Sequence, residues 1–259
     1  MIERGMAGTL AARSGLRTAL RAAVPWARSA APAVNSQRRN FSMMMTPEFS
    51  KALSSGVAAQ PHHDAVKLHL EDCQPIRWTN KELDRQVVAF AKGLEQADFA
   101  AGSKLVVWTK DVAEGVVAQL GAVHAGLSVT VLGADANADD LAKAMVGARG
   151  LVFSPNLQPN EAAVNAVLSV VPEIKGVAED KVIASEEFPE LRFVFTTGFY
   201  RREGMVKYAK IFCHDPSYTV AAKSLGKIEY AGPGTPTKVT KLPLFDETVT
   251  FQRDDADFE

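Results

Sequence analysis

The chain has 259 residues, of which 47% are hydrophobic and 23% charged, a composition typical of a globular protein with a sizeable core. No run of 18 or more apolar residues occurs, so we expect no transmembrane segment. The formal net charge of −1 hides an uneven distribution, because the first 41 residues are strongly basic.

Residues 1–41 contain seven arginines, no lysine and one acidic side chain, Glu3. This composition is typical of a mitochondrial presequence. A basic nucleic-acid-binding arm is the alternative, which we disfavour because such arms usually mix in lysines. Residues 39–42 resemble the cleavage site of the matrix processing protease. We therefore expect a protein on the matrix side of the inner membrane, with a net charge of about −7 and no nucleic-acid partner.

The segment after the presequence is interpreted in two parts. Residues 42–60 read as a linker or arm with a short helix around residues 49–53. Residues 61–74 contain an apolar and polar alternation that is typical of a strand, and this strand begins the folded domain. We expect that domain to occupy residues 61–214.

The clearest helix signal lies near residue 80. Thr79 and Glu82 have the spacing of a capping box, in which a hydroxyl and a carboxylate bind backbone N–H groups that the first helical turn leaves unpaired. The apolar residues that follow recur on one helical face. They are Leu83, Val87, Phe90, Ala91 and Leu94.

A strand, helix and strand follow. Residues 104–109 and 127–132 are short apolar runs without alternation, as expected of strands covered on both faces. The helix between them starts near Asp111 and predicts a parallel pair with a crossover connection. Gly115 and Gly121 are expected to let this helix lie close to the sheet.

The pattern continues toward the C-terminus and predicts a doubly wound, mostly parallel α/β sheet with helices on both faces. The remaining expected elements are a helix opened by Asn137 and Asp140, a strand at 151–154, a helix opened by Pro159 and Asn160, strands at 182–184 and 191–197, and a helix at 203–212.

Three motifs carry a family resemblance. They are T-x-x-E-L-D-R from Thr79, L-G-A-V-H-A-G-L-S-V from Leu120, and FPELRFVFTTGFYRREGMVKYAK from Phe188. On these motifs the chain resembles the N-terminal part of the adenylate-forming superfamily, the acyl-CoA synthetases and their AMP-binding relatives, over about residues 60–212. The resemblance implies the fold of that N-terminal subdomain.

Enzymes of that superfamily hold ATP with a loop of the type T-S-G-T-T-G-x-P-K, because backbone N–H groups and a cation must neutralise the leaving pyrophosphate. The nearest string, residues 196–200, continues into Arg201 and Arg202 without a second Thr-Gly or a Pro-Lys. The later adenine, ribose and lysine segments have no candidate. We therefore expect no catalytic residue, no cofactor and no enzyme activity. Gly198, Arg201 and Arg202 could meet an anionic headgroup such as CoA, with surface salt bridges as the alternative.

Other site patterns are absent or ambiguous. Neither G-x-G-x-x-G nor a P-loop occurs. Residues 132–135 follow a strand at the sheet edge where ligands of open α/β folds bind, but a plain turn is the favoured interpretation. We expect no metal site, because the only cluster of ligand types has irregular spacing. That cluster is His62, His63, Asp64 and His69.

The two cysteines, Cys73 and Cys213, are too few for a disulfide framework. We expect free thiols in a reducing compartment, although the sequence leaves a disulfide between them open. Cys213 and His214 are sequence neighbours, which is poor geometry for a catalytic pair.

Residues 215–259 are rich in Pro and Gly and end in acidic residues, which predicts an extended arm without a core element. We expect the arms at 42–60 and 215–259 to contact other protein subunits. The resulting hypothesis is a non-catalytic accessory subunit of a respiratory-chain complex or ATP synthase. The alternatives are a matrix protein that binds an acyl or CoA thioester, or one half of a split acyl-CoA ligase.

Overall fold

The computed structural model describes residues 47–69, 76–109, 112–178, 181–198, 202–217, 226–233 and 249–252. The chain divides into two units, Met1–Arg38 and Arg39–Glu259, and the first unit lies outside the described residues. The expected presequence, Cys73 and Arg201 also lie outside them. No described helix is long and apolar enough to cross a membrane.

A six-stranded sheet forms the centre of the second unit, with the strand order β7-β6-β5-β3-β4-β8. Every neighbouring pair in it is parallel, which confirms the predicted fold class. Its strands are β3 (Lys104–Trp108), β4 (Ser128–Leu132), β5 (Ala148–Phe153), β6 (Phe193–Thr196), β7 (Val206–Lys207) and β8 (Ile228–Ala231).

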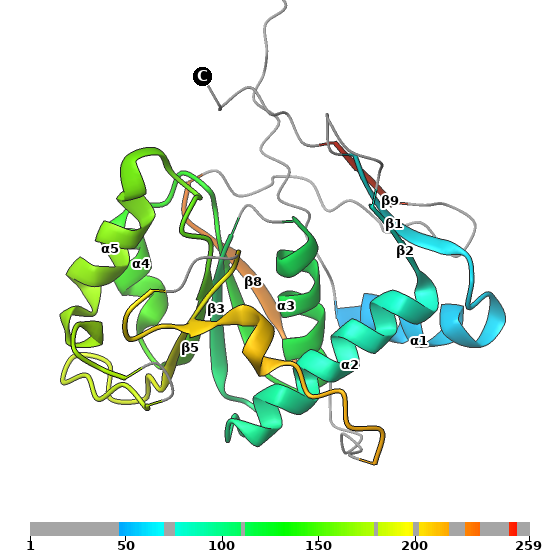
Figure 1. Ribbon diagram of the computed structural model, residues 1–259, viewed down its shortest axis with the longest axis horizontal. Coiled ribbons are helices and arrows are strands. Elements are labelled where there is room, and N and C mark those ends of the chain that lie inside the picture. Colours follow the sequence, from blue (N-terminus) through cyan, green and yellow to red (C-terminus); the bar gives the residue numbers. More distant parts are fainter. Residues whose placement is uncertain are drawn as a thin grey trace, which may run out of the picture. The chain divides into compact units, whose positions relative to one another are not determined.

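Helices cover both faces of this sheet (Figure 1). One apolar core joins the sheet to α2 (Asn80–Gln96) and α3 (Val112–His124). A second core joins the opposite face to α4 (Ala138–Met145) and α5 (Ala162–Val170). Central strands are therefore buried on both sides, which explains their continuous apolar sequences.

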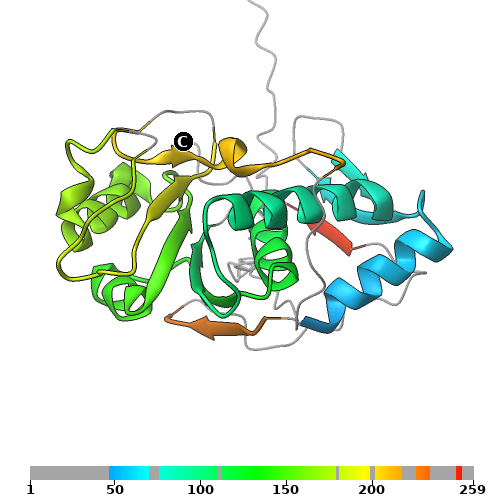
Figure 2. The same cartoon turned by 90° about the horizontal axis from the view of Figure 1, so that it is seen from below.

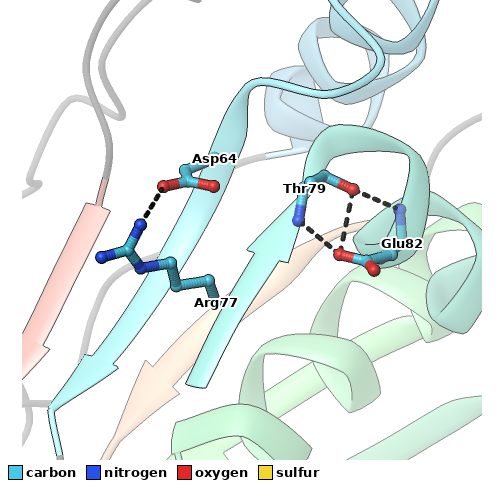
Figure 3. Close-up of polar contacts among 4 residues, drawn as sticks. All are labelled: Asp64, Arg77, Thr79 and Glu82. Carbon is cyan, nitrogen blue, oxygen red and sulfur yellow. Dashed lines mark hydrogen bonds and ion pairs between the residues drawn. The ribbon is translucent and has the colours of Figure 1, made fainter. Parts of the chain in front are cut away.

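A smaller, three-stranded sheet has the order β2-β1-β9. Its strands are β1 (Asp64–His69), β2 (Ile76–Thr79) and β9 (Val249–Gln252). β1 and β2 are antiparallel, and the Arg77 guanidinium lies 3.9 Å from the Asp64 carboxylate (Figure 3).

The Thr79 backbone and hydroxyl both donate to the Glu82 carboxylate, at 2.9 and 3.0 Å, while the Glu82 N–H donates to the Thr79 hydroxyl at 3.3 Å. The predicted capping box is confirmed.

Replacing Thr79 with alanine should lower the free energy of unfolding by about 1 kcal/mol, because the Glu82 N–H loses its side-chain acceptor. Loss of the carboxylate's hydroxyl partner should also weaken the depression of the Glu82 pKa, which the Thr79 backbone and side chain together produce. Urea unfolding measures the first effect. Lys81→Ala, an exposed change in the same turn, is the control, and equal losses in the two variants would contradict the capping role.

The predicted helix at residues 203–212 is wrong. Gly204 has a φ of +68°, and the chain then forms β7 and a short 3-10 helix, η3 (Tyr208–Ile211). Residues 206–217 run as a strap along α2, as Figure 2 shows. The Cys213 N–H donates to the Ala89 carbonyl at 3.0 Å. The apolar spacing of this segment reflects burial against α2 and the sheet, not helical periodicity.

Helix α2 accepts the strap because Gly93 has no side chain. A Cβ at this position would overlap the backbone carbonyl of Ile211. On the same helix, the Phe90 ring contacts two rings of the strap. Its centroid lies 5.2 Å from that of Tyr208 and 5.6 Å from that of Phe212. The strap and α2 therefore share one aromatic core.

Both expected arms contribute to the folded unit. Helix α1 (Pro47–Ala59) is longer than the predicted helix at 49–53, and its Leu53 lies in the core shared with α2 and α3. β8 lies within the expected C-terminal arm and pairs with β4, so the prediction that this arm has no core element is wrong for residues 228–231. A short edge strand such as β8 has little hydrophobic periodicity in its sequence, and its pairing with β4 decides its structure.

Two smaller expectations also differ from the structure. Residues 182–184 form no strand, although the Ile183 N–H donates to the Arg192 carbonyl at 2.9 Å. Gly121 does not bring α3 close to the sheet. A Cβ there would meet the Phe90 ring at 2.7 Å, so this glycine allows close contact between α3 and α2.

His124, at the end of α3, should make the fold sensitive to acid. Burial lowers its pKa below the ordinary value of 6.5, and the nearby Asp84 and Glu95 carboxylates oppose this shift only in part. As the pH falls through 6.5, the unfolded chain therefore binds a proton more readily than the folded chain, and stability is lost. His124→Gln should lose less stability than the natural chain between about pH 7.5 and about pH 5.5.

Urea unfolding at the two pH values measures this difference. Burial raises the pKa of Asp84, which acts in the opposite sense, because stability from that group is lost as the pH rises through its pKa. Asp84→Asn, alone and combined with His124→Gln, separates the two contributions. An unchanged pH dependence in His124→Gln would exclude His124 as the acid-sensitive group.

Candidate functional site

The carboxyl edge of the parallel sheet is the candidate site, because ligands of open α/β sheets bind there. Strands β3, β5 and β6 end in one row, with Trp108 opposite Phe153 and Phe153 opposite Thr196. The ladder continues one step further. The Ser154 N–H donates to the Trp108 carbonyl and the Thr197 N–H to the Phe153 carbonyl, both at 3.0 Å. Three loops therefore leave the sheet side by side.

Trp108 occupies much of this edge. It is the largest side chain in the fully buried core, on the face covered by α4 and α5. Its indole Nε1–H donates to the Gly133 carbonyl at 3.0 Å, so the ring supports the loop that follows β4. An indole is well suited to this position because its ring is apolar and its single donor has a partner.

Gln158 connects the loops that follow β4 and β5. Its Nε2 donates to the Ala134 carbonyl at 3.2 Å and to the Ala136 carbonyl at 2.9 Å. The segment at 132–135 is thus a turn held by Trp108 and Gln158. This arrangement agrees with the plain-turn interpretation of that segment.

Two of the three residues proposed to meet an anion are described. Gly198 follows β6 with a φ of +81°, is exposed, and has no heavy atom within 4 Å of the position a Cβ would take. The Arg202 guanidinium binds the Glu161 carboxylate at 2.6 Å. Arg202 is therefore engaged in a salt bridge, the alternative that the sequence left open. Anion binding by these residues stays a prediction.

Sequence reasoning missed two features of this edge. Thr196 is only 1% exposed, and its buried hydroxyl has no hydrogen-bond partner. Asn160 and Glu161 both have positive φ, at +54° and +56°, immediately before α5. A polar residue two positions after the buried Val194 was the available signal for Thr196, whereas nothing local marks Glu161 as the partner of Arg202.

The described groups at this edge include the Thr196 hydroxyl, the Asp135 carboxylate and the Arg202 guanidinium paired with Glu161. In the described part of the chain, no group of three or more His, Cys, Asp or Glu side chains could hold a metal ion. Cys213 and His214 lie on the strap along α2, and the His214 ring stacks on Phe212 with centroids 6.0 Å apart.

A family model described as AMP-binding enzyme matches residues 55–210. The match covers the end of α1, part of each sheet, and the start of the strap. The sequence has no significant match among curated proteins.

Solved structures share the fold at low sequence identity. A putative long-chain-fatty-acid CoA ligase from Rhodopseudomonas palustris CGA009 has a TM-score of 0.53 at 13% identity, over 69% of this chain and 38% of that chain. Acetoacetyl-CoA synthetase from Streptomyces lividans has a TM-score of 0.52 at 18% identity, over 68% and 26%. The anthranilate CoA ligase AuaEII has a TM-score of 0.51 at 15% identity, over 72% of this chain and 31% of that chain. The chain thus spans well under half the length of these neighbours.

Proposed function

The chain belongs to the AMP-binding enzyme family, and we propose that it uses this fold without catalysis, as an accessory subunit of a large assembly at the mitochondrial inner membrane. A respiratory-chain complex or ATP synthase is the proposed host. The subunit would lie on the matrix side and contribute structure to the assembly.

The observation that carries the proposal is that several side chains at the carboxyl edge of the sheet are bound within the fold. Trp108 and Gln158 bind backbone carbonyls of the loop that follows β4, and Arg202 is paired with Glu161. Groups that could meet a ligand are thus used to hold loops together.

The composition of the N-terminal segment supports the proposed location. Residues 1–41 carry seven arginines and one acidic side chain, as mitochondrial presequences do. Residues 42–259 are acidic by about seven charges, which disfavours anionic lipid and nucleic acid as partners.

The test is native separation of mildly solubilised mitochondrial membranes, with mass spectrometry locating peptides of this chain. The proposal expects comigration with one respiratory complex or with ATP synthase, at constant stoichiometry across detergents. Migration near the 27.9 kDa chain mass or below would overturn it.

A second function is favoured by the open backbone at Gly198 and the unpartnered Thr196 hydroxyl beside it. These groups could bind part of an acyl or CoA thioester, or of a substrate in a split acyl-CoA ligase. The three neighbours named above are, by title, CoA ligases or synthetases.

Thermal unfolding with CoA, an acyl-CoA and ATP distinguishes the two functions. A ligand at 100 times its Kd stabilises the folded state by about 2.7 kcal/mol, which raises the melting temperature by several degrees. The accessory-subunit proposal expects no such shift with any of the three. A saturable shift that Thr196→Val abolishes would favour the second function.

A further inference from the structure

We draw no further inference here: the strongest candidate, the side-chain cluster at the N-terminus of α5 where the Arg202 guanidinium binds the Glu161 carboxylate, belongs to the carboxyl-edge site already described, and nothing in the described part of the chain shows the buried Thr196 hydroxyl pointing into it.

Discussion

Replacing Gly93 with alanine should destabilise the fold by roughly 3 kcal/mol or more, the range of severe overpacking against a backbone group. The added Cβ would overlap the Ile211 carbonyl, which has no flexible end that could move aside. Relief requires the strap at residues 206–217 to leave α2, and with it the Cys213 N–H bond to Ala89 and the aromatic contacts of Phe90.

Gly115→Ala is the matched control for this prediction, because Gly115 is also a buried glycine inside a helix. A Cβ at Gly115 would meet the Thr109 methyl group at 3.2 Å and the end of the Gln119 side chain at 4.0 Å, both of which belong to side chains. Alanine is favoured over glycine in a helix by about 1 kcal/mol. Urea unfolding should show Gly115→Ala near the natural stability and Gly93→Ala far below it. Similar values for the two variants would contradict the assigned role of Gly93.

The helices and central strands were predictable because their signals are local. Thr79 with Glu82, and Asn137 with Asp140, form the capping boxes that their spacing indicates. The buried strands read as continuous apolar runs since both of their faces are covered. Strands alternating with helices then leave few arrangements other than a parallel doubly wound sheet.

The strap and β8 were not predictable, because contacts distant in sequence decide both. The strap needs Gly93 in α2, more than 100 residues earlier, to let its backbone approach. β8 needs Gly226, where a Cβ would overlap the Leu127 carbonyl at the start of β4. In each case a glycine allows a close backbone approach, and the sequence alone does not say which glycines do so.

The candidate site was predictable only in its position. The end of β6 could be placed from its apolar run, and with it Gly198 at the carboxyl edge. The pairing of Arg202 with Glu161 spans 41 residues and depends on how η1 (Pro159–Glu161) meets the loop after β6. The role of Gln158 could not be predicted either, because no sequence spacing marks a glutamine that connects two loops.

Trp108→Ala should cost about 3–5 kcal/mol of stability, the usual range for truncating a fully buried aromatic side chain. The loss has two sources. The ring leaves a cavity between the sheet and the α4 and α5 layer, and the Gly133 carbonyl loses its indole donor. Trp108→Phe separates them, because it retains most of the apolar volume and removes only the donor. It should cost about 1–3 kcal/mol, as expected for a buried polar group left without a partner.

The stability losses of the Trp108 variants also bear on function. If Trp108 and Gln158 hold the loop after β4 as structural side chains, the double variant Trp108→Phe with Gln158→Leu should lose more stability than either single variant, because that loop then lacks both side-chain donors. Urea unfolding of the two single variants and the double variant measures these losses. A cost below about 1 kcal/mol for Trp108→Ala would mean that water replaces the ring without difficulty, as at an open binding site. That result would move the balance from the accessory role toward a thioester ligand at this edge.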